Sequence, residues 1–87
     1  QNYPNPFNGE TRIQFDIPEP TGLRIVIYDM TGREVVELLR SDAHPVGYHE
    51  ISWSGNNSSG HRVASGIYLI SFQSDSFRAT RKMVLLK

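Results

Sequence analysis

The strongest constraint on this chain is a strict alternation of apolar and polar residues within short runs. In the run TRIQFDI, residues 11–17, every second side chain is apolar and the others are polar. In LRIVIYD and IYLISFQ every second side chain is again apolar or aromatic, although some of the intervening positions are apolar too. A period of two is typical of a β-strand with one buried face, and no long segment shows the 3.6-residue period of a helix. The side chains expected on buried faces are Ile13, Phe15, Ile17, Leu23, Ile25, Ile27, His49, Ile51, Trp53, Tyr68, Ile70 and Phe72.

Prolines, glycines and small polar residues separate these runs at spacings near ten residues. Such spacing favours an antiparallel β-sandwich or a small barrel of about seven short strands. The run REVVELL is compatible with either a strand or one helical turn, whereas SDAHPVG (41–47) and SGNNSSGH (54–61) are expected to be loops. The expected strands are 11–17, 23–29, 33–39, 48–53, 62–64, 67–73 and 77–86.

The chain has 87 residues, which is the size of one domain. Its opening, QNYPNPFNGE, holds two prolines, which restrict themselves and the residues before them to extended conformations. We therefore expect an extended lead-in over residues 1–10 and a β-sandwich over residues 11–87. Because the sequence does not begin with Met, we expect it to be a piece of a longer protein, with any export signal upstream.

The composition excludes several functional classes. Nine Lys and Arg residues balance nine Asp and Glu residues, which argues against a general nucleic-acid-binding surface. The absence of cysteine excludes disulfides and thiolate metal sites. The longest apolar runs have four residues and are too short to span a bilayer.

No residue pattern in the sequence is typical of catalysis or of cofactor binding. His44, His49 and His61 form no metal-binding pair and are expected to be structural. The loop 54–60 offers only Ser and Asn side chains, whereas calcium sites normally need carboxylates. We therefore predict no catalytic residue, no metal and no cofactor, and we expect that the chain is not an enzyme.

Four aromatic side chains are candidates for a sugar-binding platform: Tyr28, Tyr48, Trp53 and Tyr68. Core packing is the favoured interpretation for Trp53, because it shares a face with Ile51.

The closing stretch TRKMVLLK places four apolar residues between lysines. Because residues 83–86 are apolar at every position, we predict a strand that is covered on both faces. Lys82 and Lys87 would hold the two ends of this stretch in water. Charged residues are expected to shield the sheet edges and keep the chain monomeric, namely Glu37, Arg78 and Arg81.

Five motifs occur in order over essentially the whole chain: QNYPNPFN, YDMTGREV, PVGYHEISW, ASGIY and RKMVLLK. Together they resemble the type A C-terminal sorting domain of the type IX (Por) secretion system. The pattern is also similar to the immunoglobulin-like domain of the flagellar hook-capping protein. Either resemblance implies an antiparallel immunoglobulin-like β-sandwich. Two departures from the sorting-domain pattern are Gly9-Glu10-Thr11, where that family often has Pro-Ser-Thr, and Ser54, where it has an acidic residue.

The sorting-domain resemblance implies that the chain is an address for secretion. The implied partners are an outer-membrane translocon, a sortase-like peptidase and an N-terminal cargo domain in the same Bacteroidetes-type protein. The implied location is the periplasm in transit, and then the medium or the cell surface. Recognition is expected to involve Pro45, Gly47, Tyr48, Gly66, Tyr68, Lys82, Met83, Val84, Leu85, Leu86 and Lys87.

Two further functions stay open from the sequence. One is an accessory spacer or glycan-binding module of an extracellular enzyme or adhesin, and the other is a flagellar hook-capping assembly domain. Independently of any resemblance, Gly47 and Gly66 suit sharp entries into strands. Tyr48 and Tyr68 follow these glycines, and we expect each to pack its ring while its hydroxyl stays hydrated.

Overall fold

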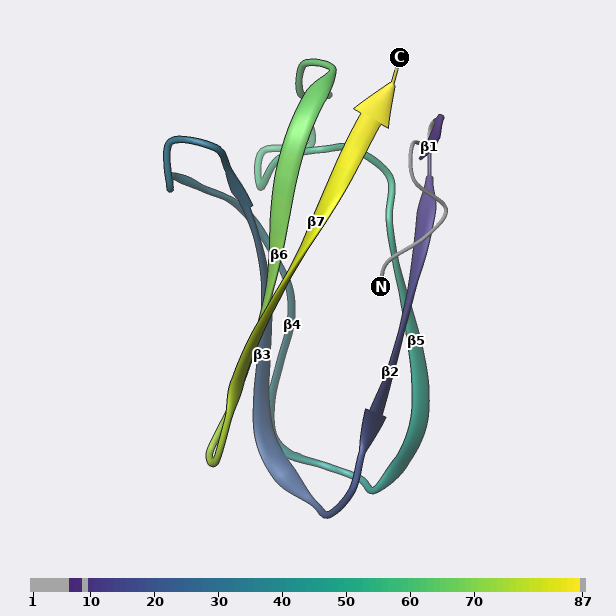
Figure 1. Cartoon of the computed structure of the whole chain (residues 1–87), viewed down its shortest axis with the longest axis vertical. Coiled ribbons are helices and arrows are strands. Elements are labelled where there is room, and N and C mark those ends of the chain that lie inside the picture. The colour runs from purple at the N-terminus through teal and green to yellow at the C-terminus, as the bar shows by residue number, and fades with distance from the viewer. Residues whose placement is uncertain (1–6, 9, 87) are drawn as a thin grey trace.

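Seven β-strands form two facing sheets in the computed structural model, which describes residues 7–8 and 10–86 (Figure 1). The larger sheet has the strand order β1-β7-β6-β3-β4, and the smaller sheet pairs β2 with β5. All pairings are antiparallel except β1 with β7, which is parallel. The prediction of an all-β sandwich is confirmed. The strands are β1 (Phe7–Asn8), β2 (Thr11–Ile17), β3 (Thr21–Asp29), β4 (Glu34–His44), β5 (Gly47–Trp53), β6 (Gly66–Ser74) and β7 (Arg78–Leu86).

The core lies between the sheets and contains the side chains that the alternation placed inward. β2 shows this most clearly, because its buried and exposed residues alternate without exception. Trp53 is 2% exposed, and its ring meets the Tyr68 ring edge-on with centroids 5.3 Å apart. Its indole Nε1 donates a 2.9 Å hydrogen bond to the carbonyl oxygen of Asn56. The prediction that Trp53 belongs to the core is confirmed.

The seven strands differ in part from the seven that the sequence predicts. Residues 62–64 form no strand, and only an isolated bridge joins Arg62 to Asn56. The additional strand is β1, which lies within the predicted lead-in and places Phe7 opposite Leu85. A two-residue strand has no period of its own, so only its pairing with a distant segment defines it. The other lead-in residues, 1–6 and 9, lie outside the described part of the chain together with Lys87.

β4 is a strand throughout, and it is longer than predicted. It runs from Glu34 to His44, so residues 41–44 are a strand and not the expected loop. The partner strand supplies the reason, because β3 places Leu23 opposite Ser41 and Thr21 opposite His44. Backbone hydrogen bonds to β3 therefore make residues 41–44 a strand, although their polar sequence alone does not favour one.

Five glycines of the described chain have positive φ, and two of them lie where the chain enters β4 or β5. Gly32 has φ of 89° in the turn from β3 to β4, and its N–H donates a 3.0 Å hydrogen bond to the carbonyl oxygen of Asp29. Gly47 has φ of 129° at the start of β5. The value at Gly47 agrees with the sequence prediction of a sharp entry into a strand at this position.

The closing strand β7 is covered on one face only, which corrects the prediction of a strand buried on both faces. Met83 and Leu85 point into the core and are 1% and 0% exposed. Leu86 is 48% exposed, and Lys82 is also exposed. Among the described residues no third layer lies over this face of β7, so Val84 and Leu86 keep contact with solvent.

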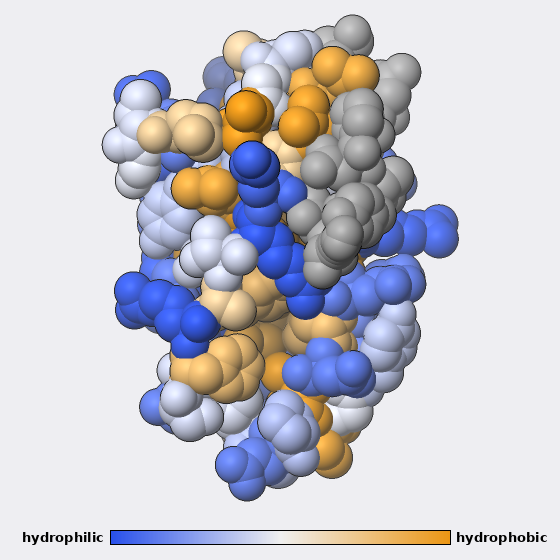
Figure 2. All heavy atoms as spheres, in the orientation of Figure 1, coloured by the Kyte–Doolittle hydropathy of each residue, from blue (hydrophilic) through white to orange (hydrophobic). Residues whose placement is uncertain are grey.

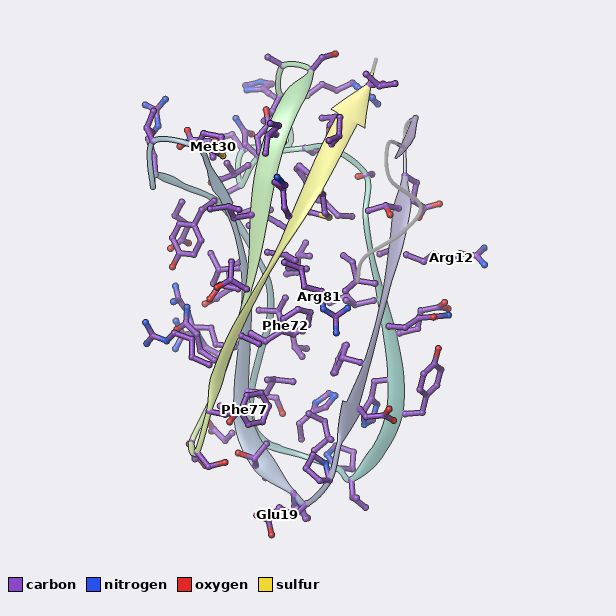
Figure 3. The ribbon with its side chains drawn as sticks, in the orientation of Figure 1. Arg12, Glu19, Met30, Phe72, Phe77 and Arg81 are labelled. Atoms are coloured by element: carbon purple, nitrogen blue, oxygen red, sulfur yellow. The ribbon has the colours of Figure 1, made fainter. Side chains whose placement is uncertain are left out.

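One side of the sandwich, between β2 and β7, is bridged by a side chain. Arg81 points from β7 into the gap between the sheets, toward Phe72 (Figure 3). Its Nη1 atom donates a 3.0 Å hydrogen bond to the carbonyl oxygen of Gln14 on β2. Arg81 therefore links the two sheets, a role beyond the edge shielding expected from the sequence.

Candidate functional site

The closing strand β7 holds five of the eleven residues that the sequence assigns to recognition. Successive side chains of a strand point to opposite faces, so the buried Met83 and Leu85 anchor β7 in the core. Lys82, Val84 and Leu86 therefore lie on the outer face of the larger sheet. Lys87 lies outside the described residues. The same strand thus carries an anchoring face and a face that a partner can reach.

Gly66 and Tyr68 lie on β6 directly beside this strand. Gly66 pairs with Leu85 and Tyr68 pairs with Met83, so these predicted residues do meet in space. The Tyr68 hydroxyl donates a 2.6 Å hydrogen bond to the carbonyl oxygen of Ala64, and the ring is 7% exposed. Burial raises the pKa of Tyr68, with a smaller contribution from the negative charge of Asp29. The expectation of a hydrated hydroxyl is therefore wrong for Tyr68, because a backbone acceptor replaces water.

Pro45, Gly47 and Tyr48 lie at the opposite end of the sandwich, where β4 connects to β5 (Figure 1). Tyr48 is 62% exposed. The structure therefore separates the predicted recognition residues into two groups, one at each end of the long axis. The group on β6 and β7 lies together through strand pairing, and of its members Tyr68, Met83 and Leu85 are buried.

Two histidines pack together at the β4–β5 end. The ring centroids of His44 and His49 lie 4.4 Å apart, and the Phe15 ring stacks on His49 at 5.5 Å. A 2.8 Å hydrogen bond joins His49 Nε2 to the carbonyl oxygen of Pro45. Burial, and to a lesser extent the neighbouring His49, lowers the pKa of His44. This packing agrees with a structural role for both histidines.

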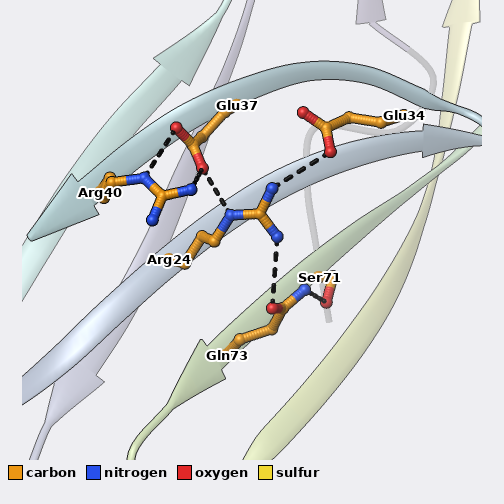
Figure 4. Close-up of polar contacts among 6 residues, drawn as sticks. All are labelled: Arg24, Glu34, Glu37, Arg40, Ser71 and Gln73. Carbon is orange, nitrogen blue, oxygen red and sulfur yellow. Dashed lines mark hydrogen bonds and ion pairs between the residues drawn. The ribbon is translucent and has the colours of Figure 1, made fainter.

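A charged network covers the outer face of β3 and β4 (Figure 4). Arg24 bonds to Glu37 and Glu34, and Arg40 donates a 2.9 Å hydrogen bond from Nη2 to Glu37. The hydrogen bond to Glu37 raises the pKa of Arg24, whereas Arg40 and then Arg24 lower the pKa of Glu37. The charges of this region thus satisfy one another, and they protect the β4 edge from pairing with other chains.

A polar hollow of about 580 Å³ lies between the β3–β4 turn and the loop that follows β5. Two carboxylates line the hollow, and Asp29 is the less exposed of them. It accepts hydrogen bonds from the Thr31 N–H and hydroxyl and from the Arg33 N–H, at 2.9, 2.6 and 3.1 Å. The Thr31 hydroxyl is the main reason that the pKa of Asp29 is lowered. Asp29 therefore closes the turn. In the described part of the chain, no three His, Asp or Glu side chains gather to hold a metal ion.

The four aromatic residues proposed for a sugar platform do not form one. Trp53 and Tyr68 are buried in the core, Tyr48 is exposed at the β4–β5 end, and Tyr28 lies on β3 beside Leu69. The structure therefore contradicts a platform built from all four rings.

The sequence profile of the FlgD Ig-like domain matches residues 2–76. This chain belongs to the FlgD Ig-like domain family. The match confirms the immunoglobulin-like fold and, of the two resemblances drawn from the motifs, the one to the flagellar hook-capping protein. No curated protein matches the chain.

Solved structures with this FlgD Ig-like fold include FlgD from P. aeruginosa, with a TM-score of 0.66 and 20% identity over 86% of this chain. FlgD from Xanthomonas campestris, described in connection with hook capping in flagellar assembly, has a TM-score of 0.64 and 25% identity over 87%. PorZ, a surface component of the type IX secretion system of Porphyromonas gingivalis, has a TM-score of 0.67 and 21% identity over 100%.

This FlgD Ig-like domain spans only part of each of those proteins: 57% and 55% of the two FlgD chains and 11% of PorZ. The family profile ends at residue 76, before β7 begins. The strand that carries five of the eleven predicted recognition residues is therefore outside the family match. No helix among the described residues is long and apolar enough to cross a membrane.

The sequence analysis missed two features, one on the outer face of β6 and one between the two sheets. Ile67 and Leu69 alternate with the buried Tyr68 and Ile70, so their place on the outer face of β6 was available from the period-two pattern. The bridge from Arg81 to Gln14 had no local signal, because its two ends are 67 residues apart.

Proposed function

We propose that this FlgD Ig-like domain is a non-catalytic secretion module that directs an attached cargo domain across the outer membrane by the type IX system. Its partners would be the outer-membrane translocon and a sortase-like peptidase. The cargo would pass through the periplasm and end in the medium or on the cell surface. The recognition roles of the predicted residues belong to this proposal.

The observation that carries the proposal is the construction of β7. Two buried side chains, Met83 and Leu85, fix the strand in the sheet, while Lys82 and Leu86 stay exposed on its other face. A translocation apparatus can thus contact an ordered strand without unfolding the domain. The five-motif resemblance and the likeness of the whole chain to PorZ support the same function.

The second candidate function is a hook-capping assembly domain of a flagellar protein. The family match and the two FlgD structures favour it, and they support it more directly than they support a sorting role. The two candidates differ in what they require of β7, which the family profile leaves out.

The test is a fusion of residues 1–87 to a periplasmic reporter, produced in a host with the type IX machinery. We expect the reporter outside the cells only when the module and the machinery are both present. Deletion of Met83–Lys87 should abolish export. Release that is equal in a host lacking the translocon, or equal for the reporter alone, would refute the sorting function.

A separate experiment tests the hook-capping candidate. The module would replace the Ig-like domain of FlgD in a motile host, and hooks would be counted by electron microscopy. We expect no hooks under the sorting function. Hook assembly by this chimera, together with failure of the export assay, would establish the second candidate instead.

A further inference from the structure

We propose that an apolar and cationic patch on the outer face of β6 and β7 is the surface on which a protein partner docks, and that the partner presents an apolar surface bordered by carboxylates. The inference rests on the proposed function only in taking the partner to be part of the transport apparatus. The patch, called here the β6–β7 patch, consists of Ile67, Leu69, Lys82, Val84 and Leu86.

The strand register brings these side chains together. Ile67 lies opposite Val84, and Leu69 lies opposite Lys82, on the face that points away from the core. Directly opposed side chains of an antiparallel pair have Cβ atoms about 5 Å apart, so the members touch across the strands. Leu69 also lies opposite Tyr28 on β3, which extends the apolar surface across a third strand.

Two aliphatic side chains of the patch are exposed to solvent rather than packed in the core. Ile67 is 40% exposed and Leu86 is 48% exposed, although β-branched and leucine side chains are usually buried. Figure 2 shows hydrophobic surface over the upper ends of β6 and β7 beside hydrophilic surface. Contiguous apolar surface with a polar border is typical of an interaction site.

The charges around the patch point to the chemistry of the partner. By the alternation of β7, Arg78 and Lys82 share its outer face, and residues 78–87 contain no acidic residue. Residues 1–77 contain five cationic and nine acidic residues, so this part of the chain carries a net charge of −4. None of the ion pairs among the described residues includes Lys82 or Arg78, whereas Arg24 and Arg40 are neutralised within the β3–β4 network. The outer face of β7 is therefore positive without compensation, and a partner with carboxylates complements it.

A second copy of the chain fits this surface less well than an acidic partner. A two-fold contact through the patch would bring Lys82 and Arg78 of one copy toward the same cations of the other, and like charges at an interface oppose binding. An anionic membrane is also less suitable, because a flat sheet face with two half-exposed aliphatic side chains buries little apolar area in lipid. The test below distinguishes an acidic protein partner from a second copy of the chain and from an anionic membrane.

The test uses the full module fused to its reporter. One variant carries Ile67→Ser and Leu86→Ser, and another carries Lys82→Glu. The matched controls are Val46→Ser, an exposed apolar residue at the β4–β5 end, and Arg12→Glu, whose side chain points away from the molecule on β2 (Figure 3). Circular dichroism and urea unfolding of each purified module establish that the fold is kept.

We expect both patch variants to reduce export by about tenfold or more, as loss of central interface contacts does, while both controls stay within about twofold of the parent. A photo-crosslinker at position 86 should form an adduct with a component of the apparatus, and Lys82→Glu should remove that adduct. Wild-type export by both folded patch variants, with export still abolished by deletion of Met83–Lys87, would overturn the patch and leave the proposed function intact. Wild-type export by the deletion as well would remove both.

Two further measurements test for self-association of the module and for membrane binding. Sedimentation velocity of the module should give a monomer, and a dimer that the patch variants dissociate would overturn the proposal in favour of self-association. Vesicles of phosphatidylglycerol and phosphatidylcholine should not co-sediment with the module. Co-sedimentation that Lys82→Glu abolishes would overturn the proposal in favour of a membrane.

Discussion

Arg81 on β7 reaches across the sandwich to Gln14 on β2, where its Nη1 atom lies 3.0 Å from the carbonyl oxygen. The guanidinium carbon also lies 4.8 Å from the centroid of the Phe72 ring. Among the described residues the smaller sheet consists of β2 and β5, and the bond from Arg81 satisfies one backbone acceptor of β2. The Arg81 side chain thus joins β7 of the larger sheet to β2 of the smaller sheet.

Replacing Arg81 with Ala should lower the free energy of unfolding by about 1–3 kcal/mol, because a charge-assisted hydrogen bond and a cation–π contact are lost together. Urea unfolding followed by tryptophan fluorescence measures the change. Arg12→Ala is the control, because this exposed residue on the same β2 should change the stability by less than about 0.5 kcal/mol. Equal stability of the two variants would show that the bridge does not stabilise the sandwich.

Neighbouring leucines of β7 should respond differently to truncation. Leu85 is 0% exposed and Leu86 is 48% exposed. Leu85→Ala should cost about 2–5 kcal/mol through lost burial and a residual cavity, and Leu86→Ala less than about 1 kcal/mol. Thermal unfolding of both variants tests the assigned faces of the strand, and a larger loss for Leu86→Ala would mean that the faces are reversed.

Removal of the Tyr68 hydroxyl should destabilise the domain measurably. Tyr68→Phe deletes the 2.6 Å hydrogen bond to the Ala64 carbonyl oxygen and should cost about 1 kcal/mol. Tyr48→Phe is the matched control, because Tyr48 is 62% exposed and its hydroxyl can bind water. A loss confined to Tyr68→Phe in urea unfolding supports the role of the hydrogen bond, whereas no difference between the variants would contradict it.

The His44–His49 pair should make the fold sensitive to mild acid. The pKa of His44 is lowered from 6.5, first by burial and then by the charge that His49 can carry. The unfolded chain therefore binds a proton more readily than the folded chain. The contribution of His44 to stability should be constant above pH 6.5 and should be lost as the pH drops from 6.5 through the lowered pKa of the folded state. Unfolding free energies measured by urea across this range give the slope.

The matched variants for the acid response are His44→Phe and His61→Gln. His44→Phe should reduce the slope below pH 6.5, because the group that titrates is gone. His61 is exposed, so His61→Gln should keep the slope of the parent. A slope that survives His44→Phe unchanged would assign the acid response to another group.

The inward faces of β2, β3 and β6 were available from the sequence, because burial on one side of a strand imposes a period of two on the residues themselves. The runs around Phe15, Ile25 and Ile70 carry that period clearly, and all three side chains are buried. The same local logic placed Trp53 in the core and a glycine-dependent entry into a strand at Gly47.

Other elements depend on partners that are distant in the sequence. Phe7–Asn8 is a strand because β7 pairs with it, and residues 41–44 are a strand because β3 does, whereas residues 62–64 find no ladder. A strand needs hydrogen bonds from another segment, so its existence at weakly patterned positions is a property of the assembled sheet.

The arrangement of the candidate site was likewise decided by the tertiary structure. Because the sequence of residues 83–86 is apolar throughout, it does not say which face a second layer covers, and a two-layer fold covers only one. Folding also placed Tyr48 and Leu86 at opposite ends of the long axis and brought Ile67 beside Val84. Local alternation therefore determined which strands bury a face, and the pairing and stacking of distant segments decided which residues share a surface.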